Sequence, residues 1–364
     1  MWILIFSLFF TAHAKRELWA RVSDRDGFKI EANCFFSGHL PQLYQSGLLL
    51  RVNCYGESDL YSQLLFIQKN APTQTLIRSR LGNLLSEPVT DHQNIFVSEY
   101  NEAGTSALYQ VTLSTIQNIP LPKNLRMLQG LSVSQGKVLA RFQDHDGLSQ
   151  QSLWLQSSWM PSSQREVSFY FQPQASQSLV LQKIRRGKGE LDESRPDEIV
   201  ISLDGGESFE VILQDRDADP SSAYLSFWNF SVVHFDRWVI IARTLQGEVA
   251  ITGRGKKIIQ TISLSSEFES LDFWPSAIDQ HGQVYLRGKR QGLHGLWRVG
   301  ASVDLILRSG DTFQGDQDLQ RVRNETPFYT APMIDRNRLF IGVGVEDFNS
   351  STFLGQALIE VLIP

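Results

Sequence analysis

The chain has 364 residues, of which 42% are hydrophobic and 11% aromatic, and its net charge is −5. These proportions are ordinary for a folded protein, and the length is sufficient for a large core. A negatively charged chain has no general attraction to nucleic acid, whose binding proteins carry a basic face, so we expect no nucleic-acid partner. No stretch is biased enough in composition to be a linker, which predicts a single domain over residues 15–364.

The first residues have the pattern of a secretory signal peptide. An apolar run from Trp2 to Phe10 is followed by the small residues Ala12 and Ala14. Small residues at this spacing mark a cleavage site, so residues 1–14 are predicted to be a signal peptide and the protein to be exported. A membrane anchor is the alternative, but a bilayer core needs about 20 apolar residues, and we expect no transmembrane span.

Cys34 and Cys54 are the only cysteines in the sequence. They lie 20 residues apart in two strand-like segments, and an even count in an exported chain is compatible with a disulfide. We predict a bridge between neighbouring antiparallel strands. Two separate buried thiols are the alternative.

Residues 276–300 form a unit that recurs along the chain. A turn-opening Asp is followed five residues later by an apolar strand residue, and 17 and 18 residues later by an apolar pair. These positions are Asp279, Val284, Leu296 and Trp297 in this unit, and Asp91, Phe96, Leu108 and Tyr109 in an earlier one. The pattern is typical of strand, turn and strand, and agreement at four positions indicates a repeat.

Seven copies of the unit can be recognised, each with one strongly apolar strand. If this is the inner strand of each copy, the anchors are Leu49, Phe96, Val138, Leu181, Val239, Val284 and Phe340, at intervals of 42 to 58 residues. All-β units with this period, and without amphipathic helices between them, are typical of β-propeller blades, which must stack to bury their sheets. The sequence therefore predicts an all-β, seven-bladed propeller. Six or eight blades are alternatives, because the strands before Cys34 could instead close the last blade.

Large aromatic residues lie on or beside these strands. They are Tyr109, Trp154, Trp228, Trp238, Trp274 and Trp297. We expect these rings to fill the wedges between blades, because aromatic side chains dominate protein cores. A row of stacking platforms for sugars or bases is the alternative.

The repeat units resemble two known families. Residues 277–311 are similar to the exported tandem repeat written NxxGxxAF, with Asp279 and Gly282 at the turn. Residues 88–111 resemble the repeats of TolB-like periplasmic propellers through Asp91 and the pair Leu108-Tyr109. Both resemblances imply an exported propeller, periplasmic or secreted, and neither implies an activity.

One local segment resembles the Asp-box of sialidases and related propellers. It contains Ser202, Asp204, Gly206 and Phe209 at the spacing of that motif. The resemblance implies a tight hairpin between outer strands, in which Asp accepts local backbone N–H groups and Gly tolerates positive φ. The implied role is structural.

Three groups of basic residues are candidates for contact with a partner. They are Lys183, Arg185, Arg186 and Lys188; Arg254, Lys256 and Lys257; and Lys289 and Arg290. Because acids are interspersed among them, we interpret these groups as separately solvated loops; a shared positive patch is the alternative, since equivalent loops of successive blades gather on one face. Within the repeat unit, the segment 289–295 is the expected place of contact.

The sequence contains no motif that requires a cofactor, and we expect none. Three short acidic loops, at Asp24, Asp144 and Asp215, leave calcium open, although Asp-Gly pairs also favour plain hairpin turns.

We interpret the chain as a non-catalytic, monomeric module that binds or scaffolds a protein or an envelope polysaccharide. The alternative is a glycan-acting hydrolase or lyase, with its site in the central funnel of the propeller. The candidate arginines for such a site are Arg141, Arg243, Arg287 and Arg308, but no spacing marks a catalytic group.

Overall fold

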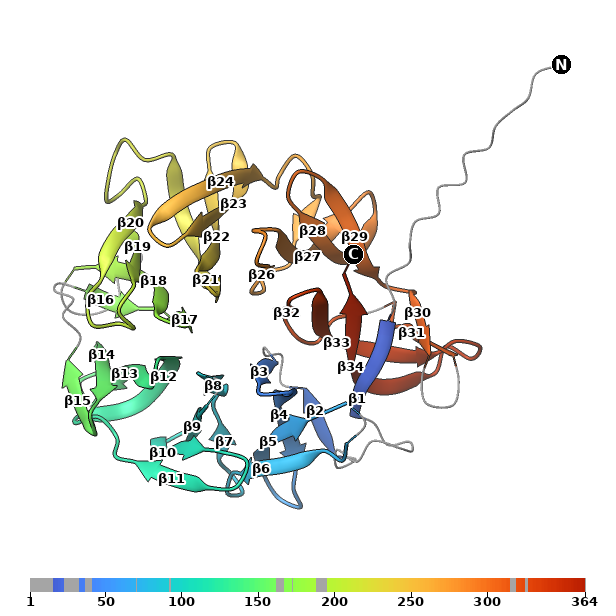
Figure 1. The fold of residues 1–364 in the computed structure, drawn as a ribbon, viewed down its shortest axis with the longest axis horizontal. Helices are drawn as coiled ribbons and strands as arrows, with labels where there is room; N and C mark the ends of the chain where they lie inside the picture. The colour runs from blue at the N-terminus through green and yellow to red at the C-terminus, as the bar shows by residue number, and fades with distance from the viewer. Residues whose placement is uncertain are drawn as a thin grey trace.

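The computed structural model shows a ring of small β-sheets (Figure 1). It describes residues 16–22, 33–36, 41–69, 71–91, 93–161, 167–171, 173–187, 195–314, 319–324 and 327–363. Within these ranges every regular element is a strand, and no helix is long and apolar enough to cross a bilayer. The predicted signal peptide, residues 1–14, lies outside the described residues.

The first four blades follow the chain in order. Blade 1 contains β2 (Cys34–Phe36), β3 (Gln42–Tyr44), β4 (Gly47–Tyr55), β5 (Leu60–Ile67) and β6 (Gln74–Arg78). Blade 2 contains β7 (Leu84–Leu85), β8 (Val89–Thr90), β9 (Ile95–Asn101), β10 (Gly104–Val111) and β11 (Ile116–Ile119). Blade 3 contains β12 (Leu125–Ser134), β13 (Lys137–Asp144), β14 (Ser149–Leu155) and β15 (Ser158–Pro161). Blade 4 contains β16 (Val167–Tyr170), β17 (Gln174–Ser176), β18 (Leu179–Arg186), β19 (Asp197–Ser202) and β20 (Glu210–Gln214).

The remaining three blades complete the ring. Blade 5 contains β21 (Tyr224–His234), β22 (Arg237–Thr244), β23 (Gly247–Arg254) and β24 (Lys257–Ser263). Blade 6 contains β25 (Ser270–Leu271), β26 (Ala277–Ile278), β27 (Val284–Arg290), β28 (Leu293–Val299) and β29 (Val303–Arg308). Blade 7 contains β30 (Thr312–Gln314), β31 (Leu319–Val322), β32 (Met333–Asp335), β33 (Arg338–Asp347) and β34 (Phe353–Leu362), together with β1 (Arg16–Val22). The protein is therefore a seven-bladed β-propeller, as the repeat count predicted.

The innermost strand of each blade is irregular. In five blades it consists of two short pieces that pair with the same second strand, such as β16 and β17 on β18. The pieces β3, β8, β17, β26 and β32 lie nearest the centre of the ring (Figure 1). In the other two blades it is one strand, β12 or β21, with shifts in its pairing register.

All seven predicted anchor residues lie on the second strand of their blades, not on the innermost one. The predicted period is thus correct, but the predicted position is wrong by one strand. The second strand is the most apolar because neighbouring blades cover both of its faces. The burial of β4, β18 and β33 along most of their lengths shows this. The innermost strand is too short and interrupted to give a comparable signal.

Both ends of the described chain meet in blade 7. β1 pairs antiparallel with β34 over six register pairs, from Arg16 with Val361 to Val22 with Gln356, and parallel with β30. β1 thus closes the last blade.

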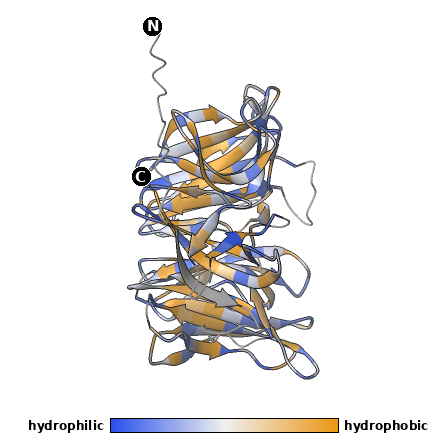
Figure 2. Cartoon of the chain, turned by 90° about the vertical axis from the view of Figure 1, so that its right-hand side faces the viewer, coloured by the Kyte–Doolittle hydropathy of each residue, from blue (hydrophilic) through white to orange (hydrophobic). Residues whose placement is uncertain are grey.

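The hydrophobic core lies in the seams between blades. One cluster joins Leu181 and Ile199 of blade 4 to Trp238 and Ile240 of blade 5. Similar clusters occupy the other seams, and Trp297 is buried in the one between blades 5 and 6. Figure 2 shows the same distribution, with hydrophobic strands stacked inside the molecule and hydrophilic residues concentrated in loops. Packing between blades therefore holds the ring together.

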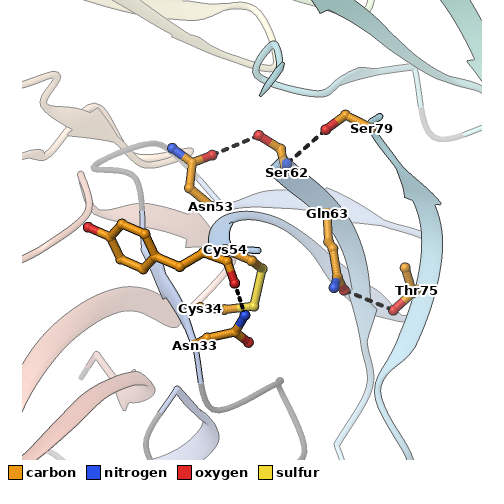
Figure 3. Close-up of a disulfide and its surroundings, with 9 residues drawn as sticks. Asn33, Cys34, Asn53, Cys54, Ser62, Gln63, Thr75 and Ser79 are labelled. Atoms are coloured by element: carbon orange, nitrogen blue, oxygen red, sulfur yellow. Dashed lines mark hydrogen bonds between the residues drawn. A yellow bond between two sulfur atoms is a disulfide. The ribbon is translucent and has the colours of Figure 1, made fainter. Parts of the chain in front are cut away.

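A disulfide joins Cys34 and Cys54, which are direct partners of the antiparallel pair β2 and β4 (Figure 3). On the adjoining strands, the hydroxyl of Ser62 donates to Asn53, and the Ser62 backbone N–H donates to the Ser79 hydroxyl. The bridge ties the innermost strand of blade 1 to the second strand.

Removal of β1 tests the closure. Residues 23–364 lack the six register pairs with β34. Since each hydrogen bond contributes about 0.5–1.5 kcal/mol net, we expect the free energy of unfolding to fall by about 3 kcal/mol or more. Urea denaturation measures it, with residues 15–364, which keep β1, as the control. Equal midpoints for the two chains would contradict this role of β1.

Candidate functional site

Four basic side chains occupy equivalent positions on second strands. Arg51, Arg141 and Lys183 each lie four residues after the start of β4, β13 and β18, and Arg287 lies three after the start of β27. Each donates to a backbone carbonyl at the irregularity in the innermost strand of the next blade. The acceptors are Leu85 (2.5 Å), Tyr170 (2.6 Å), Phe227 (2.8 Å) and Thr330 (3.3 Å), respectively.

These four contacts have a structural cause. A break or bulge in the innermost strand leaves carbonyl groups without a partner in the sheet, and a buried carbonyl without a hydrogen bond is destabilising. The preceding blade supplies the donor. Burial lowers the pKa of Arg141 to about 10, a value at which the guanidinium still carries its charge at neutral pH.

Lys183 is part of this buried set and is not a surface contact residue, so its predicted role is wrong. Its ammonium lies 2.8 Å from the Asp197 carboxylate, which Arg185 also contacts at 2.7 Å. Burial lowers the pKa of Lys183, and the Asp197 carboxylate partly opposes that shift. Lys183 lies within β18, where neighbouring blades cover both faces of the strand, whereas the sequence suggested an exposed loop.

The substitution Lys183→Met tests this assignment. It leaves the Phe227 carbonyl without its donor and Asp197 with one cation fewer, and breaking a buried pair costs about 3–5 kcal/mol. We expect a loss of about 3 kcal/mol in the free energy of unfolding. The matched control, Lys257→Met, alters an exposed lysine of β24 and should change it by less than about 0.5 kcal/mol. Equal effects would contradict a structural role for Lys183.

The other predicted basic residues do not form one patch. In each blade the strands alternate in direction, so the turn from β23 to β24 lies at the opposite end from the turns after β18 and β27. Arg254 of that turn contacts Asp236, in the hairpin between β21 and β22. Arg254, Lys256 and Lys257 therefore do not share a face with the other two groups, which rules out the alternative of one common patch and agrees with separately solvated loops.

Most of these basic groups are also neutralised by neighbouring acids. The ion pairs are Arg186 with Glu198, Lys256 with Glu210, Lys289 with Glu269 and Arg290 with Glu267. Lys257 is exposed, and Lys188 lies outside the described residues. Pairing of this kind leaves little net positive field.

Residues 202–209 form a tight turn between β19 and β20, the two outer strands of blade 4. The Asp204 carboxylate accepts hydrogen bonds from the backbone N–H groups of Glu207 and Ser208, at 3.0 Å each. Gly205 and Gly206 have positive φ, as the turn requires. Burial opposes ionisation, but hydrogen bonds from Ser202, Ser208 and the backbone outweigh it and lower the pKa of Asp204 to about 2.

Substitution of Asp204 should destabilise blade 4 in a pH-dependent manner. Hydrogen bonds to a charged group contribute about 1.5–3 kcal/mol each, which exposure reduces, so we expect Asp204→Ala to cost about 1–2 kcal/mol at pH 7. The folded-state pKa is depressed, so this contribution is complete above about pH 4 and is lost as the pH falls toward 2. Thermal unfolding from pH 2 to 7 measures it. Asp217→Ala, at an exposed acid of the connection between β20 and β21, is the control. A stability difference between Asp204→Ala and the wild type that does not change with pH would contradict the assignment.

The acidic loops at Asp144 and Asp215 are hydrogen-bonded turns. Asp144 accepts the N–H groups of Asp146 and Leu148, and Asp215 accepts those of Asp197 and Ala218. Across the described part of the chain, no three His, Cys, Asp or Glu side chains are grouped closely enough to hold a metal ion. The third acidic loop, at Asp24, lies outside the described residues.

An aromatic cluster lies at the seam of blades 5 and 6. We define it as Trp228, Phe230, Phe273 and Trp274, which belong to irregular segments of the innermost strands β21 and β25/β26. The Phe273 ring lies 4.8 Å from the Trp228 ring and 5.4 Å from the Phe230 ring, measured between centroids. Phe273 is 55% exposed, whereas the other three rings are partly buried.

A polar group adjoins the aromatic cluster. The Asp272 carboxylate accepts from Arg287 Nε at 3.1 Å and lies 2.9 Å from His294 Nε2. Burial opposes ionisation of Asp272, but His294 and Arg287 outweigh it and lower the pKa of this carboxyl. An ionised carboxylate only accepts hydrogen bonds, so His294 Nε2 carries the proton and Nδ1 is left for another partner.

A small hollow separates Trp228 from Trp274. Its volume is about 10 Å³, and its wall includes Asp272, Arg287 and the apolar side chains of Ile241 and Leu286. This is room for about one water molecule. A larger ligand would therefore lie over the rings and not inside the seam.

Sequence reasoning assigned Trp228 and Trp274 to packing between blades and gave Phe273 no role. Trp238 and Trp297 are buried between blades as predicted, and Trp228 packs against the core between blades 5 and 6, but Phe273 is exposed. The sequence does contain a signal of the aromatic cluster. Adjacent aromatic residues occur in Phe227-Trp228-Asn229-Phe230 and in Phe273-Trp274-Pro275, whereas successive side chains of a regular strand point to opposite faces. The predicted contact segment 289–295 does supply one member of the polar group, His294.

Comparison with known proteins extends only to the fold. The chain matches no protein-family model and no curated protein sequence. Among solved structures it is similar to the β-propeller domain of the Trilobed protease from Pyrococcus furiosus, whose structure shows an open velcro topology (12% identity, 87% of this chain and 96% of that one, TM-score 0.54). It is also similar to the polysaccharide lyase Uly1 (10% identity, 97% and 98%, TM-score 0.52).

A third similar structure is the acylaminoacyl peptidase of Pyrococcus horikoshii, with 10% identity and a TM-score of 0.51. The likeness covers 89% of this chain but 52% of the peptidase. At such identities, resemblance shows a common architecture and does not transfer an activity.

Proposed function

We propose that the protein is a non-catalytic binding or scaffold module that engages an exported protein or an envelope polymer. The observation that carries this proposal is the half-open aromatic cluster between blades 5 and 6. Exposed groups of large apolar side chains commonly mark interaction sites, and aromatic residues are enriched there.

The shape of the site supports binding over enclosure. Sites that enclose small substrates have volumes of roughly 300–1,000 Å³, whereas the hollow beside the aromatic cluster measures about 10 Å³. Two of the arginines considered for a catalytic funnel, Arg141 and Arg287, are bound to carbonyl groups of the next blade. Arg308 is paired with Asp311.

An exported, monomeric protein is part of this proposal. The Cys34–Cys54 disulfide supports an oxidising compartment, because such bonds are rare in reducing ones. An oxidising compartment agrees with the predicted signal peptide and with the two exported repeat families that the sequence resembles. The closure of blade 7 by β1 supports a monomer, because the chain completes its own ring.

A glycan-acting hydrolase or lyase is the second candidate, and one observation favours it. The partly exposed His294 is oriented by Asp272 at 2.9 Å, which is the arrangement of a general base held by a carboxylate. In this case turnover would depend on His294.

Two measurements on residues 15–364 separate the candidates. Pull-down from envelope extracts should recover a partner, and Phe273→Ala should lose it. Incubation with a panel of glycans should give no product. A glycan product that disappears in the variant His294→Ala would contradict the proposal and establish the second candidate.

A further inference from the structure

We infer that the aromatic cluster binds an uncharged oligosaccharide, which would stack on Phe273 and Trp228. The inference rests on the proposed function and names the class of ligand for that site.

The exposed ring of Phe273 provides the platform. It is backed by Trp228 and Phe230 at tilted angles of 49° and 60°, so its orientation is fixed by two neighbours. The face of an aromatic ring carries partial negative charge, and the C–H groups on one side of a pyranose ring carry partial positive charge. A sugar ring can therefore cover the exposed face, while its hydroxyl groups point outward to the rim.

The cluster has hydrogen-bond acceptors beside it. Trp228 Nε1 donates to Glu248 at 3.2 Å, which places that carboxylate beside the rings. His294 is partly exposed; its Nε2 faces Asp272, its ring lies 5.8 Å from that of Phe328 in blade 7, and Nδ1 is left as an acceptor. Sugar hydroxyl groups can donate hydrogen bonds, so they can use these acceptors.

Charge is balanced in the three segments that flank the cluster and its polar group, residues 243–248, 267–272 and 287–290. Their acids are Glu248, Glu267, Glu269 and Asp272, and their bases are Arg243, Arg287, Lys289 and Arg290, four against four. Three of these bases are paired, Arg287 with Asp272, Lys289 with Glu269 and Arg290 with Glu267, and Arg243 lies opposite Glu248 in the sheet.

This balance favours a neutral ligand. A charged polymer would gain no net attraction and would have to displace a partner from one of the pairs, leaving a charge without compensation. An uncharged sugar can bind without breaking any of them. The same balance argues against a strongly acidic or basic peptide as the occupant.

The experiment is a titration of residues 15–364 with cellohexaose, maltohexaose, laminarihexaose and chitohexaose. Hexagalacturonate serves as the charged comparison. Calorimetry gives the dissociation constant, and tryptophan fluorescence, to which Trp228 beside Phe273 contributes, is a second measure of binding. At least one neutral oligosaccharide should bind saturably and shift the fluorescence.

Variants locate the site. Phe273→Ala should weaken binding at least about ten-fold, the equivalent of about 1.4 kcal/mol. Phe273→Leu, which keeps an apolar group but removes the aromatic face, should also weaken it. Phe348→Ala alters another exposed ring, 42% accessible, in the turn between β33 and β34, and should bind within two-fold of the wild type. Thermal unfolding verifies that each variant is folded.

Several outcomes would overturn the inference: no binding of any neutral oligosaccharide, tighter binding of hexagalacturonate, or equal affinity in the wild type and both Phe273 variants. If the pull-down recovers a protein through Phe273 while every oligosaccharide fails to bind, the glycan assignment is wrong and the proposed binding function stands. If the oligosaccharide binds at Phe273 and is cleaved, the ligand class stands and the non-catalytic proposal fails.

Discussion

Each blade of this propeller is a sheet with two apolar faces, and neither face can be left to water. The seams satisfy this constraint, since residues of neighbouring blades share one cluster, as Leu181 and Trp238 do. Because every blade needs a neighbour on both sides, the ring has to close. β1 closes the ring: it pairs with β34, so the start of the described chain lies against the strand near the end of the chain.

The innermost strands, nearest the axis of the ring, produce a second requirement: their carbonyl groups need hydrogen-bond donors. The innermost strands are short, interrupted or bulged, and their irregularities leave carbonyl groups without partners in the sheet. In four seams a buried Arg or Lys from the preceding blade fills this need. These buried cations thus join neighbouring blades and do not serve a ligand in a central funnel. A cation suits the task because it can reach across the seam and donate to more than one acceptor, as Lys183 does.

The same irregularities create the candidate site. Where β21 bulges and β25 gives way to β26, the strand no longer alternates, and adjacent aromatic residues cannot all face the seam. Phe273 is left half open, on a base of Trp228 and Phe230. Asp272, Arg287 and His294 lie beside it because the paired strand β27 continues into the hairpin that carries His294. The departure from regular β-structure that requires the buried cations also produces the exposed surface.

The sequence by itself determined the fold class and favoured seven blades, because hydrophobic alternation and turn residues are local properties that recur along the chain. It also indicated the pairing of Cys34 with Cys54, since two strand segments 20 residues apart are natural hairpin neighbours. Only the tertiary structure decided which strand is innermost, that Lys183 is buried, and that the turn at Arg254 faces away from the other basic loops. It also decided that Phe273 and His294 share a site. These properties depend on strand direction, on breaks in the innermost strands and on contacts between blades, none of which is written in the local pattern of the chain.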